Sequence, residues 1–182
     1  MIFFLHFFVK NPTVNLGYNP NLHWKTIIMK PKSEYIKSFC VTGLCVRTKN
    51  IDEFNSESAR IPGLWTQFYS EGVAEQISTR LPDTPIFGVY SAYESDATGF
   101  YDLTVGVSVD KSNSGFENIV IEAGEYLVFE AKGVMPDAII HTWSNIWSYF
   151  EQHPKICRSF LTDFEAYKSP EEAHIYIGIS TT

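Results

Sequence analysis

An internal repeat restricts the fold of this sequence more than any other feature. Residues 64–68 and 146–150 share the order apolar, Trp, hydroxyl, polar, Phe. The same ungapped offset lays Leu44-Cys45-Val46 on Tyr126-Leu127-Val128. A single offset that matches both a strand-like and a helix-like segment is hard to obtain by chance. We therefore expect two copies of one structural unit.

The first copy is predicted from hydrophobic periodicity and from turn residues. Pro62 suits the first turn of a helix, and the polar, Gly-containing residues 94–99 are typical of a hairpin connection. Residues 111–115 contain no apolar side chain and are interpreted as a linker. The expected order is strand, helix, strand, strand, at residues 35–47, 61–77, 84–93 and 101–109.

The second copy repeats this order after the linker. Its closing strand matches that of the first copy, because residues 103–107 and 175–179 alternate in the same way. Correcting for the different hairpin loops places Glu94 opposite Glu165, each directly after an aromatic residue. The four expected elements lie at residues 126–131, 136–152, 160–167 and 174–180.

These patterns predict an α+β fold built from duplicated β-α-β-β units. One unit alone buries little apolar surface, so two are expected to join their antiparallel sheets about a pseudo-twofold axis. The two helices would then flank a central groove, a common place for a pocket. The first repeat would cover about residues 35–110 and the second about residues 116–180.

The first 32 residues are interpreted as an extension of uncertain role that precedes a domain at residues 33–182. The aromatic run at residues 1–9 is too short to span a bilayer and lacks the basic start of a signal peptide. Three cysteines without Cys-x-x-Cys spacing indicate neither disulfides nor a thiolate metal site. We therefore expect a cytoplasmic protein with no metal, no cofactor and no membrane partner.

The net charge of −7 argues against direct binding to nucleic acid, whose phosphates the molecule would repel. Aromatic residues make up 15% of the chain, and their faces can hold flat organic molecules as well as fill a core. Acidic residues lie among these aromatics without any basic run, which favours a cationic or neutral ligand.

Glu165 is the leading candidate for an acidic ligand-binding residue. Strand alternation puts it on the same face as Asp163 and Tyr167, pointing either to solvent or into the groove. In the groove, its charge would favour a cation that also rests against aromatic rings. The other expected ligand-binding residues are aromatic or acidic: Trp65, Phe68, Tyr69, Tyr90, Glu94, Tyr101, Trp147 and Phe150, with Trp143 as a further candidate. Each helix aromatic could instead pack on the sheet.

The second half resembles the gyrase-inhibitor-like family, which includes the effector-binding domains of AraC-type and MerR-type transcription activators. The resemblance covers about residues 33–180 and rests on residues 126–133, the Trp-containing helix, residues 163–167 and the final strand. It implies the duplicated fold, a groove for drug-like cations, and Glu165 as the acidic centre. The family often ends with Ile-Pro-Ile, whereas this chain has Gly178 at the middle position.

The length and the lack of a helix-turn-helix segment resemble stand-alone members carried on integron gene cassettes. A homodimer or a separate regulator protein is then an expected partner. Two other functions stay open. One is a small-molecule hydrolase in which Glu165 activates water and Tyr90, Tyr93 or Tyr101 donates to the ligand. The other is a protein-binding inhibitor of a topoisomerase.

Overall fold

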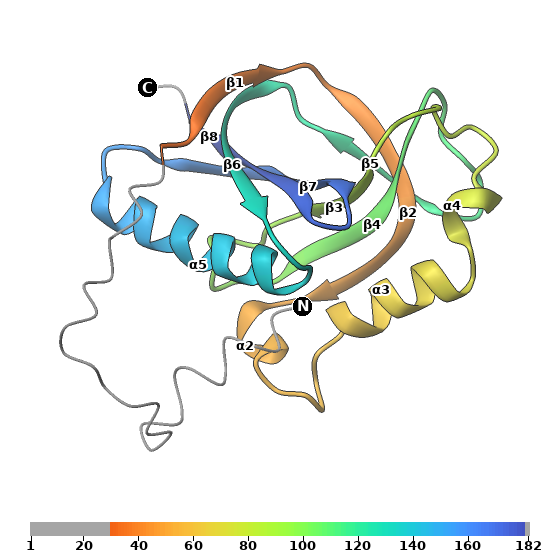
Figure 1. Ribbon diagram of the computed structural model, residues 1–182, viewed down its shortest axis with the longest axis horizontal. Helices are drawn as coiled ribbons and strands as arrows, with labels where there is room; N and C mark the ends of the chain where they lie inside the picture. The colour runs from red at the N-terminus through yellow and green to blue at the C-terminus, as the bar shows by residue number, and fades with distance from the viewer. Residues whose placement is uncertain (1–29, 181–182) are drawn as a thin grey trace.

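The computed structural model describes residues 30–180, which form an α+β fold around one eight-stranded antiparallel sheet (Figure 1). The strand order is β1-β6-β8-β7-β3-β4-β2-β5. The strands are β1 Lys32–Ile36, β2 Phe39–Thr48, β3 Ile86–Ser91, β4 Tyr101–Val109, β5 Glu117–Ile121, β6 Gly124–Lys132, β7 Arg158–Ser169 and β8 Glu172–Ile179. The helices are α2 Asn50–Glu53, α3 Ile61–Ser70, α4 Val73–Gln76 and α5 Asp137–Gln152.

The sheet curls strongly because one continuous stretch of chain serves both of its ends. Only Lys37 and Ser38 separate β1 from β2, yet β1 pairs with β6 while β2 pairs with β4 and β5. The chain therefore arches from one end of the sheet to the other, as the orange β1 and β2 show in Figure 1. The inside of the curl is filled by an apolar cluster that includes Val41, Phe87 and Phe164.

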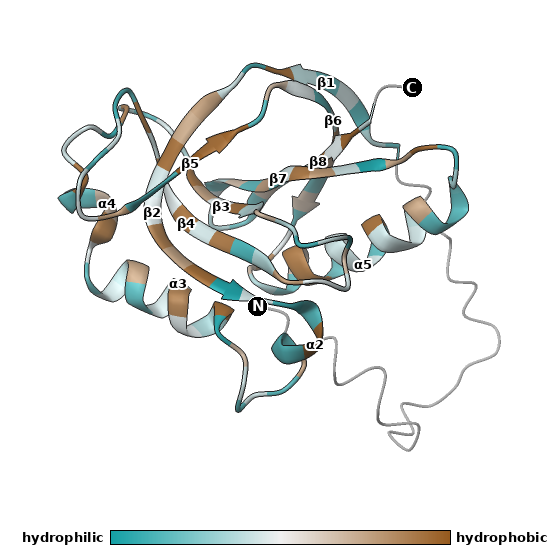
Figure 2. Ribbon diagram, turned by 180° about the vertical axis from the view of Figure 1, so that it is seen from behind, coloured by the Kyte–Doolittle hydropathy of each residue, from teal (hydrophilic) through white to brown (hydrophobic). Residues whose placement is uncertain are grey.

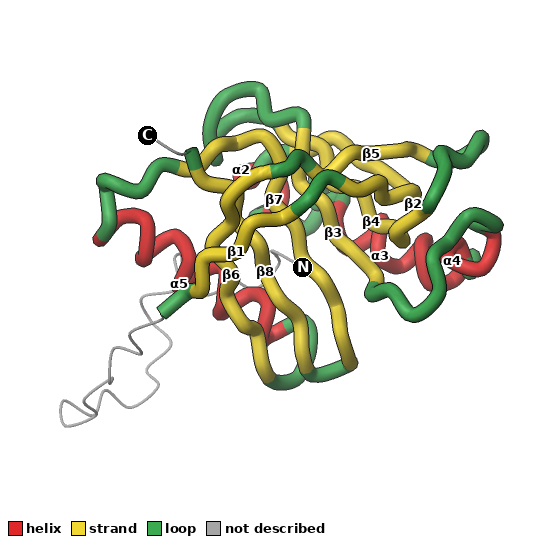
Figure 3. The backbone as a smooth tube through the Cα atoms, turned by 90° about the horizontal axis from the view of Figure 1, so that it is seen from above, coloured by secondary structure: helices red, strands yellow, loops and turns green. Residues whose placement is uncertain are grey.

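The helices cover the outer face of the sheet. Helix α3 packs on β2 and β4, and α5 packs on β6, so the two helices lie apart on the same side (Figure 3). The amphipathic pattern that predicted them is visible in Figure 2, where hydrophobic and hydrophilic positions alternate along both helices. Two separate outer cores result, one beneath α3 and α4 and the other beneath α5.

The middle of the sheet lies between these two cores. There β3 pairs with β7, and Gly88 stands directly opposite Glu165. On one side the strands run β7, β8, β6, and on the other they run β3, β4, β2. The carboxyl group of Glu165 thus lies between the parts of the sheet that α3 and α5 cover.

The expected α+β class with an antiparallel sheet is confirmed, and several element boundaries are corrected. The single strand expected at residues 35–47 is divided between β1 and β2. The helix expected at residues 61–77 ends at Ser70, because the chain turns at Gly72 with a left-handed φ of 60°. Strand β5 and helix α2 were not expected from the sequence. The expectations for residues 1–28 lie outside the described residues.

The close approach of β2 and β4 gives a first prediction. A Cβ added to Gly43 would collide with the carbonyl oxygen of Val105, which is backbone and has nowhere to move. We expect Gly43→Ala to lower the free energy of unfolding by about 1–3 kcal/mol, as overpacking does. Gly63→Ala is the control, because a Cβ there meets nothing within 4 Å and alanine favours the helix. Urea denaturation of both variants measures this, and an unchanged midpoint for Gly43→Ala would contradict it.

Candidate ligand-binding site

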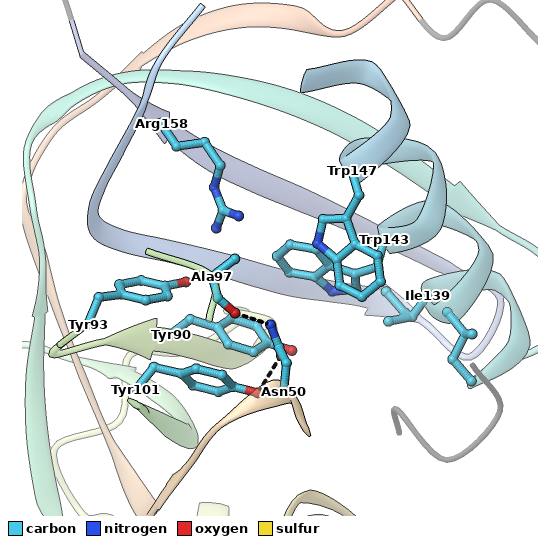
Figure 4. Close-up of a pocket in the computed structure, with 10 residues that line it drawn as sticks. Asn50, Tyr90, Tyr93, Ala97, Tyr101, Ile139, Trp143, Trp147 and Arg158 are labelled. Carbon is cyan, nitrogen blue, oxygen red and sulfur yellow. Dashed lines mark hydrogen bonds between the residues drawn. The ribbon is translucent and has the colours of Figure 1, made fainter. Parts of the chain in front are cut away.

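A small aromatic cavity lies between α5, α2 and the β3–β4 hairpin (Figure 4). Its volume is about 40 Å³. The rings of Tyr90 and Trp143 lie 5.3 Å apart between their centroids, and the centroids of Trp143 and Trp147 lie 6.5 Å apart. The lining residues are Asn50, Tyr90, Tyr93, Ala97, Tyr101, Ile139, Ile140, Trp143, Trp147 and Arg158.

Glu165 lies next to this cavity and is fully buried. The Tyr90 hydroxyl and the Trp143 indole N–H donate to its Oε1 at 2.9 and 2.7 Å. The Tyr167 hydroxyl donates to its Oε2 at 2.6 Å. The three donors come from β3, α5 and β7, so both oxygens are hydrogen-bonded by aromatic side chains of different elements.

Strand alternation explains why this carboxylate turns toward the helices. Asp163, Glu165 and Tyr167 occupy alternate positions of β7 and face the same side. Gly88 supplies the space opposite, because a Cβ there would lie 3.1 Å from Oε2 of Glu165 and 3.3 Å from the Trp65 ring. Any larger residue on β3 at this point would press on the carboxylate.

Burial sets the protonation behaviour of the site. Burial raises the pKa of Glu165, and the hydrogen bonds from Tyr167, Trp143 and Tyr90 partly oppose that rise. Burial and the nearby Glu165 charge also hold the pKa of Tyr90 and of Tyr167 well above the ordinary phenol value. Both phenols therefore remain protonated hydrogen-bond donors at neutral pH.

A second carboxylate, Asp163, is held at another wall of the cavity. Asp163 is fully buried and pairs with Arg158 at 2.5 Å, while the Tyr93 hydroxyl donates to it at 2.6 Å. The backbone N–H of Gly178 donates to its other oxygen at 2.8 Å. A proline at position 178 would lack this N–H, so the departure from Ile-Pro-Ile supplies a hydrogen bond to Asp163.

Helix α2 closes the cavity on the side of the β3–β4 hairpin. The Tyr101 hydroxyl donates to Asn50 at 3.1 Å, and the Asn50 side-chain amide donates to the carbonyl of Ala97 at 2.7 Å (Figure 4).

The buried Glu53 of α2 accepts hydrogen bonds from the backbone N–H groups of Arg60 at 3.0 and 3.2 Å and of Ile61 at 3.2 Å. The Glu53 carboxylate thereby caps the start of α3.

A second hollow of about 690 Å³ lies on the Tyr167 side of Glu165. Trp65 and Tyr69 line it with their rings stacked at 6.0 Å, and Tyr167 meets the edge of Trp65 at 5.0 Å. The Trp65 indole N–H is buried and has no hydrogen-bond partner within the described residues. Both spaces are largely apolar, but the hollow is more open to solvent than the cavity on the Tyr90 side.

The structure brings four of the residues expected from the sequence together. Tyr90, Tyr101 and Trp147 line the cavity, and Glu165 lies beside it. Strand alternation left open whether Glu165 points to solvent or into the groove. Its side chain is buried on the outer face of the sheet between α3 and α5, because β7 is a central strand.

The other expected residues lie elsewhere. Trp65 and the exposed Tyr69 line the second hollow. Phe68 is buried in the core beneath α3, and Phe150 packs against the core beneath α5. Phe68 continues the buried stripe of Ile61 and Leu64 in α3, and Phe150 lies one turn beyond the buried Ile146 of α5.

Glu94 does not lie opposite Glu165. It is exposed in the β3–β4 hairpin, where its carboxylate accepts a hydrogen bond from the backbone N–H of Phe100 at 3.3 Å. The loop correction failed here because β3 ends at Ser91, which leaves Glu94 in the hairpin loop, whereas Glu165 lies within β7 opposite Gly88. Register with the neighbouring strands, rather than the loop, decides which residues share the central face.

Several residues of the cavity were missed by the sequence analysis as ligand-binding residues. Trp143 was only a further candidate, and Tyr93 was considered only as a hydrolase donor. Asn50 belongs to a helix that was not expected, and Arg158 lay outside the expected strand. Alternation had placed Asp163 on the face of Glu165. The Arg158 side chain meets Asp163 because the register of β7 with β8 is irregular between these two residues.

The described part of the chain contains no helix long and apolar enough to cross a membrane. Among the same residues, no three His, Cys, Asp or Glu side chains gather in a way that could hold a metal ion.

Comparison with protein families gives a match over residues 34–179 to the model for Cass2, described as integron-associated effector binding protein. This chain belongs to the Cass2 family. The match spans both halves of the sheet and every residue of the cavity. The resemblance to effector-binding domains of integron cassettes is therefore confirmed.

Individual proteins are similar to this chain over most of its length. YobU of Bacillus subtilis (strain 168) is 32% identical over 146 residues, which cover 76% of this chain and 89% of YobU. An integron cassette protein from the mobile metagenome of Vibrio cholerae has 34% identity and a TM-score of 0.73, over 84% of this chain and 97% of its own. SAV2435, solved with tetraphenylphosphonium, has 22% identity and a TM-score of 0.69, over 84% and 94% of the two chains.

The raised pKa of Glu165 predicts a stability effect at the site. A buried carboxyl with a raised pKa stabilises the fold below its unfolded pKa, and that contribution is lost as pH rises through the folded pKa. Glu165→Gln mimics the uncharged carboxyl, so we expect its melting temperature to equal or exceed that of the unmodified protein at neutral pH.

The difference in melting temperature should shrink as the pH falls below the raised pKa of Glu165. Thermal scans across this range measure it, with Glu57→Gln, at an exposed position, as the control. At each pH, the melting temperature of Glu165→Gln is compared with that of the unmodified protein. The prediction is contradicted if this difference is smaller at neutral pH than at acid pH.

Proposed function

We propose that this protein is a stand-alone receptor for cationic, aromatic small molecules, which it holds at Glu165. The observation that carries the proposal is the buried carboxylate beside an aromatic cavity. Among the described residues, Glu165 forms no ion pair, and its three hydrogen-bond donors are all uncharged. A buried negative charge without a cation is costly, and a ligand cation would offset that cost.

The aromatic walls favour the same class of ligand. Tyr90, Tyr101, Trp143 and Trp147 present rings around one small space. A cation over such a ring face gains about 0.5–2 kcal/mol, more where water is excluded. A flat or aryl-substituted cation therefore gains from the Glu165 charge and from the rings together, whereas a neutral molecule gains only from the rings.

The known ligand of a relative supports this proposal. SAV2435, which shares the fold, is described as bound to tetraphenylphosphonium, a cation surrounded by four aryl groups. Such a molecule combines the positive charge and the aromatic surface that the cavity beside Glu165 would favour. A net charge of −7 further favours cations over anions in this chain.

The two halves of the sheet account for the position of the groove. We propose that they are duplicated β-α-β-β units related by a pseudo-twofold axis between β3 and β7. The strand order supports this, because β3-β4-β2 on one side mirrors β7-β8-β6 on the other. The central pair would then carry the binding residues, and α3 and α5 would form the walls of the groove.

Ligand entry requires side chains to move. Pockets for drug-sized ligands have roughly 300–1,000 Å³, far more than the cavity volume of about 40 Å³. Within the described part of the chain, two side-chain hydrogen bonds of Asn50 join the short helix α2 to Ala97 and Tyr101 beside the cavity. We therefore propose that α2 and the β3–β4 hairpin shift outward as the ligand enters.

Titration with tetraphenylphosphonium, followed by tryptophan fluorescence and calorimetry, tests the function. We expect Glu165→Gln to weaken binding at least tenfold, because it removes a negative charge beside Tyr90 and Trp143 that no cation of the described residues balances. Glu57→Gln, which removes an exposed charge, is the matched control and should bind as the unmodified protein does. Equal affinity of all three proteins would remove the basis for a receptor of this kind.

The pH dependence of this binding provides a second readout. Protonation of Glu165 removes its charge, so affinity for the cation should fall as the pH drops through the raised pKa of Glu165. The affinity of Glu165→Gln should stay flat over the same range. A parallel decline in both proteins would show that another group controls binding.

A pair of aromatic substitutions decides which hollow the ligand occupies. Trp147 lines the cavity without bonding to Glu165, so Trp147→Ala should cost about 0.5–2 kcal/mol of binding free energy. Tyr69→Ala removes an exposed ring of the second hollow and should leave the affinity for tetraphenylphosphonium unchanged. The reverse result would place the ligand beside Trp65 instead.

A further inference from the structure

We infer that the cavity selects, among aromatic cations, those that carry a neutral hydrogen-bond acceptor such as an ester, amide or ketone oxygen, and that Arg158 binds this acceptor. The inference rests on the proposed function, since it concerns the same cavity. It adds a donor group to a site whose charge is otherwise set by Glu165.

Arg158 is a buried residue of the cavity wall. Its side chain is only 10% exposed and lines the same space as Tyr93 and Trp147. Figure 4 shows the guanidinium reaching down from its strand into the region between Tyr93 and the two tryptophans. A ligand held among these tryptophans would therefore lie near it.

The charge of Arg158 is already balanced. Asp163 pairs with one terminal nitrogen of the guanidinium, and Asp163 also accepts hydrogen bonds from Tyr93 and Gly178. This pair adds no net charge to the cavity and so does not repel a cation that Glu165 attracts. Arg158 acts toward the ligand as a hydrogen-bond donor.

Part of the donor capacity of Arg158 is unused. Its Nε–H is buried and has no hydrogen-bond partner within the described residues. An unpaired buried donor costs free energy, and an acceptor that reaches it recovers this cost. Guanidinium groups carry five N–H donors in a fixed plane, so a second donor of Arg158 can join the same acceptor.

The acceptor is expected to be neutral. Asp163 already lies against Arg158, and a ligand carboxylate would bring a second negative charge beside it in a water-poor space. Two carboxylates bound to the same guanidinium repel each other strongly where the dielectric constant is low. An ester, amide or ketone oxygen accepts the hydrogen bond without this repulsion.

Local backbone geometry fixes the guanidinium in place. The pairing of β7 with β8 is irregular between Arg158 and Asp163, and Phe160 within this bulge has a left-handed φ of 51°. The Arg158 guanidinium lies 4.5 Å from the centre of the Phe160 ring. Bulges often redirect side chains at functional sites, and this one holds Arg158 at the cavity.

Three matched phosphonium cations test the inference on the unmodified protein. They are pentyltriphenylphosphonium, (4-carboxybutyl)triphenylphosphonium and the methyl ester of the latter. We expect the ester to bind roughly tenfold more tightly than the pentyl compound, the size of one hydrogen bond to a charged donor, and more tightly than the carboxylate. Calorimetry measures all three, and equal binding of ester and pentyl compound would overturn the inference.

Two conservative variants assign the preference to Arg158. Arg158→Lys keeps a cation beside Asp163 but removes the Nε–H, and the ratio of ester to pentyl affinity should fall toward one. Arg47→Lys is the matched control, because Arg47 also pairs with an aspartate, Asp102, at 2.9 Å but lies outside the cavity. It should keep the preference, and an Arg158→Lys variant that keeps it as well would contradict the role of Arg158.

The same series separates the inference from the proposed function. If tetraphenylphosphonium binds through Glu165 but the ester shows no advantage, the receptor function stands and the role of Arg158 fails. If none of the phosphonium cations binds, the receptor function itself fails. Circular dichroism of Arg158→Lys identifies a folding defect, and the ligand comparison on the unmodified protein does not depend on that variant.

Discussion

The buried carboxylate of Glu165, hydrogen-bonded by three aromatic side chains and paired with no cation of the described chain, is the interaction on which this architecture depends. Its donors Tyr90, Trp143 and Tyr167 come from β3, α5 and β7. Without these three hydrogen bonds, the free-energy cost of burying a charge in this position would be prohibitive. The carboxylate therefore ties the middle of the sheet to α5, and it stores an unbalanced charge that a ligand cation can neutralise.

In the function that we propose, stability and cation binding place opposite demands on Glu165. Burial raises the pKa of Glu165, so the charged form that attracts a cation is also the form that the fold tolerates least. Asp163 is equally buried, but Arg158 balances its charge. The two carboxylates of β7 thus differ: Asp163 is paired with a cation of the protein, and Glu165, in the function that we propose, binds a cation from solution.

The candidate site could be predicted from the sequence only in part. The residues that were wrongly predicted to bind the ligand are placed by strand pairing or by packing on a core. Alternation placed Glu165 on the face of Asp163, and the aromatic content indicated walls for a cation. Glu94 failed because it lies in the hairpin loop beyond the end of β3, and the pairing of β3 with β7 places Gly88 opposite Glu165. Phe68 and Phe150 failed because both belong to the apolar stripes that pack on the cores beneath α3 and α5.

The sequence by itself determined the order of the principal helices and strands and the antiparallel α+β class, because periodicity and turn residues are local properties. Only the resemblance to a known family pointed to Glu165 as the acidic centre, since strand alternation left its direction open. Tertiary structure alone decided that one continuous stretch of chain serves both ends of the sheet, that α2 closes the cavity, and that the bulge in β7 brings Arg158 against Asp163. These features depend on which distant strands pair and in what register. Such pairing is fixed by burial and packing across the whole sheet, which no local pattern contains.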